Sequence, residues 1–167
     1  RVRNALLRMR VVEELQRAEA LGVECLVIHP GSHRGEGEAG GLQRFGESLR
    51  ILLDQTAGLQ VKIALETTAG QGSSLGWRFE QLGDALARVH GDERVVVCVD
   101  SCHIFAAGYE LRDPDGYART MQELDRHVGL ERVAVLHAND SARPLGSRID
   151  RHAHIGEGAI GEAGFRN

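Results

Sequence analysis

The chain has 167 residues; 42% are hydrophobic, 26% are charged, and the formal net charge is -4. These values are typical of an ordinary globular domain and exclude collagen-like, disordered and membrane-spanning chains. A mildly acidic chain also does not have the basic footprint of a protein that coats nucleic acid, although a local patch or bound cations would still allow contact with DNA.

The cysteine content bears on the cellular compartment. Cys25, Cys98 and Cys102 form an odd and small set, whereas a disulfide framework needs an even and larger number. The first ten residues, RVRNALLRMR, do not have the apolar stretch of a signal peptide. We therefore expect a cytoplasmic protein in a reducing environment, without a membrane partner.

Helical and strand-like patterns alternate along the chain. Apolar residues recur at helical spacing over residues 6–18, beginning at Leu6 and Leu7, and Gly22 then precedes a β-branched run over residues 23–28. The same order recurs three times, with expected helices at 42–53, 79–89 and 117–128, glycines at Gly58, Gly91 and Gly129, and expected strands at 61–65, 95–99 and 133–136. We expect left-handed glycines after the helices and parallel strands that are covered on both faces.

A chemically distinctive residue closes each expected strand. These residues are His29, Glu66, Asp100 and His137, which are spaced 37, 34 and 37 residues apart. Parallel strands with helical crossovers at this period belong to a (β/α) barrel or a doubly wound sheet. In a barrel the carboxyl ends of successive strands meet on one face, where active sites are built. Four strand ends with metal-ligand residue types therefore favour the barrel.

The chain length limits how much of a barrel can be present. A complete eight-stranded barrel takes about 250 residues and seldom fewer than about 200. The sequence predicts only four to five β/α units. We therefore expect residues 1–167 to form a single partial barrel domain that is truncated at both ends.

Further polar residues lie in the loops that follow these strands. His33 follows His29, Cys102 and His103 follow Asp100, and Asp150 and His152 form an Asp-x-His pair. Imidazole and carboxylate ligands without thiolate suit Zn²⁺, with Mn²⁺ or Fe²⁺ as alternatives. Taken singly, each group also fits a structural histidine, a capping carboxylate or a solvated loop. His33 is the weaker of the two histidines after the first strand, and Cys102 is expected to be a small buried residue.

Two arginines accompany the Asp-x-His pair. Arg148 and Arg151 flank Asp150 in the sequence. A guanidinium group forms paired hydrogen bonds with phosphate oxygens, so both arginines are candidate phosphate or DNA contacts. A solvated charged loop is the alternative interpretation.

Several of these segments resemble motifs of the endonuclease IV type of apurinic/apyrimidinic (AP) endonuclease. The matching segments are residues 29–33 (HPGSH), 66–72 (ETTAGQG), 100–109 (DSCHIFAAGY), 137–141 (HANDS), 146–152 (GSRIDRH) and 154–158 (HIGEG). They follow one another in the family's order and span essentially the whole chain. Thr67 stands where the family also commonly has Asn.

The resemblance implies a (β/α)₈ TIM barrel that holds three zinc ions when complete, with Mn²⁺ as a possible substitute. It assigns His29 to the first ion, and Glu66, the residue expected to be catalytic, as the bridge between the first and second ions. It assigns Asp100 and His137 to the second ion. The third ion takes His103, Asp150 and His152. A family histidine on the preceding strand and a family glutamate on the final strand have no counterpart here.

The resemblance also implies an activity. Enzymes of this family hydrolyse the phosphodiester 5′ to an abasic site in double-stranded DNA, which is a step of base excision repair. We expect a monomer for the full-length protein. Because two family ligands are absent, we expect residues 1–167 alone to show little or no cleavage.

Two other functions remain open. Related barrels include sugar isomerases and epimerases, which place Glu, Asp-x-x-His and His around one divalent ion. His29 and the Asp150-x-His152 pair favour the nuclease, because a mononuclear centre does not need them. The third possibility is a non-catalytic remnant with two unpaired sheet edges.

Overall fold

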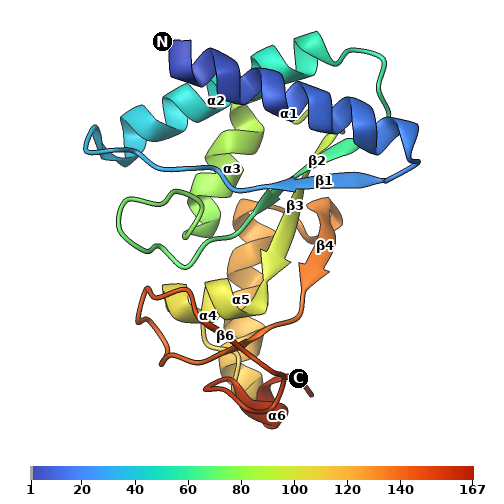
Figure 1. The fold of residues 1–167 in the computed structure, drawn as a ribbon. Coiled ribbons are helices and arrows are strands. Elements are labelled where there is room, and N and C mark those ends of the chain that lie inside the picture. Colours follow the sequence, from blue (N-terminus) through green and yellow to red (C-terminus); the bar gives the residue numbers. More distant parts are fainter. Residues whose placement is uncertain (1) are drawn as a thin grey trace.

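A computed structural model describes residues 2–167 of the chain, together with the side chains from residue 9 onward. Its centre is a parallel sheet with the strand order β1-β2-β3-β4. The strands are β1 (Cys25–Ile28), β2 (Lys62–Glu66), β3 (Val95–Asp100) and β4 (Val133–His137). Each strand pairs with the next one along the chain, so the order in sequence is also the order in space (Figure 1).

A helix precedes each strand. These helices are α1 (Val2–Ala20), α2 (Gly37–Gln55), α3 (Phe79–Arg88) and α5 (Pro114–His127). The expected alternation of four helices and four parallel strands is therefore confirmed. The four glycines that follow these helices all have positive φ, as expected. The side chains of Leu6 and Leu7, which opened the first expected helical pattern, lie outside the described residues.

The two faces of the sheet carry different side chains. The helix-covered face contributes Ile63, Val95 and Val97 to a large aliphatic core. The opposite face buries a small cluster centred on Ala64 and Cys98. In a barrel the second face is the interior, where inward side chains from neighbouring strands pack in layers. The carboxyl ends of the strands therefore lie next to the small cluster on this inner face of the sheet.

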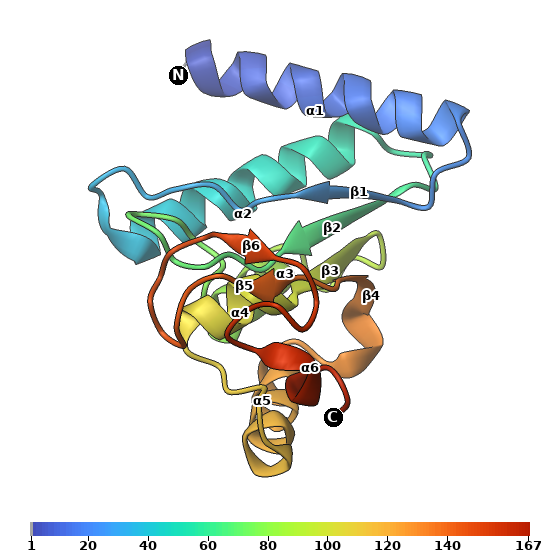
Figure 2. The ribbon, with the colours of Figure 1, turned by 60° about the horizontal axis from the view of Figure 1, so that its bottom comes forward.

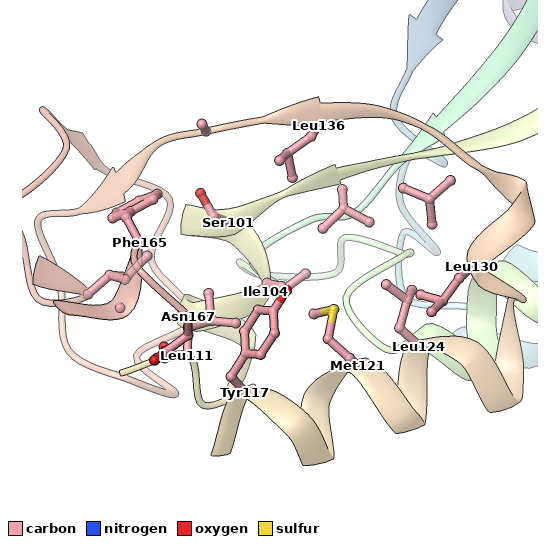
Figure 3. Close-up of a pocket in the computed structure, with 15 residues that line it drawn as sticks. Ser101, Ile104, Leu111, Tyr117, Met121, Leu124, Leu130, Leu136, Phe165 and Asn167 are labelled. Atoms are coloured by element: carbon pink, nitrogen blue, oxygen red, sulfur yellow. The ribbon is translucent and has the colours of Figure 1, made fainter. Parts of the chain in front are cut away.

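The outer edge of the sheet is less covered than its middle. Every residue of β3 is buried, whereas Leu136 of β4 is 66% exposed. Between β4 and α5 lies an apolar groove of about 460 Å³. Figure 3 shows Leu136 on one side of this groove and Tyr117, Met121 and Leu124 of α5 on the other.

Several short elements were not expected from the sequence. They are α4 (Ser101–Ala107), the 3-10 helix Leu130–Arg132, the strands β5 (Asp140–Ser141) and β6 (His152–Ala153), and α6 (Gly161–Gly164). β5 and β6 form an antiparallel ribbon. In Figure 2 this ribbon lies in front of the sheet, and Figure 1 shows β6 beyond the end to which β3 and β4 point.

Two further expectations concern membrane-spanning helices and the division of the chain into domains. Within residues 2–167, no helix combines the length and the apolar character needed to cross a membrane. That residues 1–167 form one partial domain, truncated at both ends, remains a prediction.

Candidate metal centre

The four strand-end residues converge on one edge of the sheet. Glu66 and Asp100 are the last residues of β2 and β3, His137 is the last residue of β4, and His29 directly follows β1. Asp100 and His137 are paired in the strand register. The convergence expected from a parallel sheet is therefore present, and the side chains come close enough for direct contact.

Glu66 is the central side chain of this group. Its Oε2 lies 3.0 Å from His29 Nε2, and its Oε1 lies 2.9 Å from His137 Nδ1. Burial of Glu66 opposes ionisation, but the hydrogen bonds with His29 and His137 outweigh it and lower the pKa of the carboxyl to about 2. The hydrogen bond with Glu66 also raises the pKa of His29. One buried carboxylate therefore holds two imidazoles from the outer strands.

Asp100 is fixed from three sides. It is fully buried, and its Oδ1 accepts a hydrogen bond from the backbone N–H of His103 (3.1 Å) at the start of α4. Its Oδ2 accepts a hydrogen bond from Asn139 Nδ2 (2.6 Å), and its own backbone N–H donates to Thr67 Oγ1 (2.9 Å). The N-cap geometry explains why the helix begins directly after this aspartate. The carboxylate consequently has a defined orientation toward the centre.

His103 is buried and has a defined tautomer. Its Nδ1 lies 2.7 Å from the carbonyl oxygen of Thr67. Because a carbonyl oxygen can only accept, Nδ1 carries a hydrogen, which leaves Nε2 as the candidate ligand atom. This is the arrangement that metal-binding histidines commonly adopt, with the second ring nitrogen donating to a backbone carbonyl.

The second ring nitrogen of His103 faces the Asp-x-His pair. Its Nε2 lies 3.3 Å from Asp150 Oδ2 and 3.4 Å from His152 Nε2. His152 Nε2 is 3.3 Å from Asp150 Oδ1. Tetrahedral ligands at Zn–N and Zn–O distances near 2.0–2.2 Å stand roughly 3.3–3.5 Å apart. The three side chains are therefore spaced like ligands of a single ion.

Other combinations of ligand atoms also lie within 4.8 Å of one another. They are His29 with Glu66 and His103, Glu66 with Cys98 and His137, and Asp100 with Cys102 and His152. Burial raises the pKa of both cysteines, to about 12 for Cys98. A cysteine binds a metal ion in its thiolate form, which a raised pKa disfavours. The histidine nitrogens and carboxylate oxygens of these groups are therefore the better donors. The residues present fit hard or borderline divalent cations.

A polar hollow of about 310 Å³ opens beside these ligands, with His29, His103 and Asp150 in its lining. Gln71 also lines it and accepts a hydrogen bond from the backbone N–H of Asp150 (3.2 Å). The hollow gives a small polar molecule or a phosphate group access to the candidate ligands.

The remaining candidate residues, two arginines and one histidine, lie outside the groups of candidate ligands. The guanidinium of Arg148 sits 3.7 Å above the ring of Trp77, and Arg148 and Arg151 are both exposed. His33 instead accepts a hydrogen bond from Gly35 N–H (3.2 Å) in its own turn and belongs to none of the ligand groups. Its lower rank among the candidates thus agrees with its position.

Sequence reasoning did not identify the residues that hold the ligands in place. Thr67 contacts two ligands, Asn139 contacts Asp100, and Asp140 contacts the segment after His152. Asn139 and Asp140 stand inside a recognised motif, but their roles depend on contacts between distant segments. Trp77, which stacks with Arg148, carried no signal beyond its being the only tryptophan.

Comparisons with known proteins agree with this geometry. A model of the xylose isomerase-like TIM barrel family matches residues 3–167. A protein of Chloroflexus aurantiacus named "Probable endonuclease 4" is 53% identical over 154 residues, which cover 92% of this chain and 54% of that protein. The chain therefore spans about half the length of the curated relatives it matches. The resemblance stated from the motifs is confirmed.

Solved structures support the same fold. The crystal structure of endonuclease IV from Thermus thermophilus matches with a TM-score of 0.78 and 41% identity, covering 93% of this chain and 53% of that one. A D-tagatose 3-epimerase-like protein matches with a TM-score of 0.72 at 21% identity, covering 92% and 54%. The second likeness concerns the fold alone. Together with the family match, these findings confirm the expected TIM barrel class.

Proposed function

The chain belongs to the xylose isomerase-like TIM barrel family, and from that premise we propose that it carries the metal centre of a zinc-dependent AP endonuclease. The proposed reaction is hydrolysis of the phosphodiester 5′ to an abasic site in double-stranded DNA. The names and identities of its relatives support this choice. The proposed location is the cytoplasm, and the proposed state of the full-length protein is a monomer.

One observation carries the proposal. His103 Nε2 lies 3.3 Å from Asp150 Oδ2 and 3.4 Å from His152 Nε2, and His152 Nε2 lies 3.3 Å from Asp150 Oδ1, so Asp150 and His152 add ligand atoms beyond those that contact Glu66. A sugar isomerase or epimerase with one divalent ion needs only a single such group. A centre with ligands for more than one ion fits a phosphodiester, whose attacking oxygen, leaving oxygen and phosphoryl oxygens all carry charge in the transition state.

The proposed ligand sets follow the motif resemblance, and the contacts of Glu66 with His29 (3.0 Å) and His137 (2.9 Å) support them. His29 and Glu66 hold the first zinc ion, and Glu66, Asp100 and His137 hold the second. His103, Asp150 and His152 hold the third. Mn²⁺ suits the same nitrogen and oxygen donors and is the alternative metal.

The protein groups supply position and charge to the reaction. When bound, zinc ions provide Lewis-acid polarisation of a water molecule and of the phosphodiester. Glu66 connects two ligand sets, so it keeps those sets at a fixed separation. Arg148 and Arg151 are exposed beside the third set, where their guanidinium groups can bind phosphate oxygens of the DNA backbone.

The experiment compares the chain alone with a graft. In the graft, the chain replaces the matching segment of the Chloroflexus aurantiacus relative. Both proteins are incubated with zinc and a labelled duplex that contains one tetrahydrofuran abasic analogue. We expect the graft to incise on the 5′ side of the analogue, to lose activity with a chelator and to leave an undamaged duplex intact. We expect little or no incision by residues 1–167 alone.

Three results would contradict these expectations. A folded, zinc-loaded graft that leaves the abasic duplex intact contradicts the proposed reaction. Conversion of a ketohexose by the same graft, with about one ion per chain, identifies an isomerase or epimerase. Robust zinc-dependent incision by residues 1–167 alone shows that the ligands of this chain suffice.

A further inference from the structure

Asp140 is a buried carboxylate outside the proposed ligand sets. It is fully buried at the start of β5, three residues after His137. Five backbone N–H groups donate to its two oxygens: those of Ser141 (2.7 Å), Ile160 (2.9 Å), Gly156 (3.0 Å), Gly158 (3.0 Å) and Gly161 (3.1 Å). An ionised aspartate is an acceptor-only group, so its hydrogen-bonding capacity matches this set of donors.

The donors show what Asp140 holds together. Four of the five belong to residues 156–161, which follow β6 and fold back over β5. Ala159 N–H adds a hydrogen bond to Ser141 O (2.7 Å). At Gly158 a Cβ atom would collide with Asp140 Oδ1, so this contact also requires glycine. Residues 156–161 are thus anchored to the carboxylate.

This anchor lies next to the third ligand set. His152 is the first residue of β6, and its register partner is Ser141, the residue after Asp140. β5 and β6 each contain two residues. So short an antiparallel ribbon has little stability of its own. The position of His152 therefore depends on what fixes the chain on both sides of β6.

We propose that Asp140 is a positioning residue for the third metal site, because its carboxylate anchors residues 156–161 and so holds His152 facing His103 and Asp150. The inference rests on the metal role proposed above for these three side chains. Asp140 itself does not contact the ion. Its effect on metal affinity is transmitted by the chain through β6.

The principal test is Asp140→Asn, which keeps the shape of the side chain. The amide replaces one acceptor oxygen with an N–H₂ group that faces backbone donors, and the negative charge is lost. Binding of Co²⁺ to the whole chain is followed by equilibrium dialysis and by the visible absorption of the bound ion. We expect affinity at one site to fall roughly 10–100-fold, the usual effect of losing a group that orients a ligand. Binding at the Glu66 group should remain.

Asp113→Asn is the matched control. Asp113 also accepts a backbone hydrogen bond, from Gly116 (2.8 Å) at the start of α5, but it belongs to none of the ligand groups. Asparagine caps a helix about as well as aspartate, so this control should change thermal stability little and leave every Co²⁺ site unchanged. If Asp140→Asn loses stability and keeps all Co²⁺ binding, Asp140 is only structural and the inference is wrong.

A second measurement covers the case in which Asp140→Asn does not fold. Hydrogen exchange is followed on the unmodified chain with and without Zn²⁺. Ligand binding slows exchange wherever opening must break the site. We expect zinc to slow exchange of the amides of residues 156–161, and we expect this effect to disappear in Asp150→Ala. Unchanged exchange of these amides on zinc binding overturns the inference.

Asp150→Ala also separates this inference from the proposed function. If Asp150→Ala loses one Co²⁺ site and folded Asp140→Asn does not, the positioning role is wrong while the metal site stands. If Asp150→Ala itself retains every site, the metal role of the third set is wrong, and the inference that rests on it is wrong as well.

Discussion

The two halves of the candidate metal centre hold their proposed ligands in different ways. In the strand-end half, His29 and His137 both contact Glu66, and their side chains are 52% and 38% exposed. In the loop half, the side chain of His103 is only 4% exposed, and its ring is fixed by the carbonyl of Thr67. The two imidazoles of the strand-end half therefore depend on a single carboxylate, whereas the imidazole of His103 in the loop half is held by the surrounding backbone.

This difference indicates how each half should respond to the substitution of a candidate ligand. Without Glu66, two imidazoles that project from an open sheet edge lose their common partner. In the loop half, the backbone contacts of His103 persist when one ligand is removed, so the pocket keeps its shape. We therefore expect substitutions in the strand-end half to disrupt several ligands, and substitutions in the loop half to remove one ion.

The largest effect is expected for Glu66→Gln. The amide keeps the shape but removes the charge that the two histidines share, so both ions assigned to the strand-end half should be lost. Incision by the graft should fall by roughly 10³-fold or more, since a bound ion contributes several kcal/mol and about 1.4 kcal/mol is a tenfold change in rate. Zinc per chain and the incision rate measure this. Retention of full zinc content contradicts the bridging role.

Asp150→Ala is expected to have the next largest effect and to act on the other half. It removes one of three ligand atoms spaced for a single ion, so zinc content should fall by one ion per chain and most incision by the graft should disappear. Zinc binding to the Glu66 group should be unchanged. Loss of every ion from a folded Asp150→Ala protein would show that the two halves are not independent.

The strand ends could be predicted from the sequence because each lies where an aliphatic run stops. The β-branched runs fix the strands, and parallel pairing then brings His29, Glu66 and Asp100 to one edge. The specific assignment of ions needed the family resemblance, because imidazole and carboxylate side chains at strand ends also occur in mononuclear centres.

The supporting contacts could not be predicted for a physical reason. Thr67 acts on Asp100 and His103 from 33 and 36 residues away, in part through its backbone carbonyl, which every residue possesses. Helix α4 (Ser101–Ala107) escaped notice because its first six residues are all buried. It therefore shows no amphipathic period, which is the signal that marks a surface helix.

Thr67→Val should have an intermediate effect and connects the two halves. Valine matches the shape of threonine but leaves the buried N–H of Asp100 without its acceptor, which costs about 1–3 kcal/mol of folding stability. Zinc affinity should fall roughly 10–100-fold, as is usual when a group that orients ligands is removed. Thr67→Ser keeps the hydroxyl and is the control. Equal zinc affinities for the two variants would contradict this role.

The smallest effect is expected for Cys98→Ala, which tests whether thiolate takes part in the strand-end half. Cys98 Sγ lies within 4.8 Å of ligand atoms of Glu66 and His137, yet the residue is fully buried in the small cluster on the inner face of the sheet. Burial raises the pKa of this thiol to about 12, which disfavours the thiolate form that binds metal. Cys98→Ala should keep the zinc stoichiometry and affinity.

The same substitution should lower the free energy of unfolding by only about 1 kcal/mol, because it removes one heavy atom from a packed face. Zinc titration and thermal melting of the metal-free protein measure the two quantities separately. Cys102→Ala is the matched variant beside the loop half, where Cys102 Sγ donates to Arg151 O (3.5 Å). A loss of zinc in Cys98→Ala with none in Cys102→Ala would assign a thiolate ligand to the strand-end half, and the centre would then depend on more than nitrogen and oxygen donors.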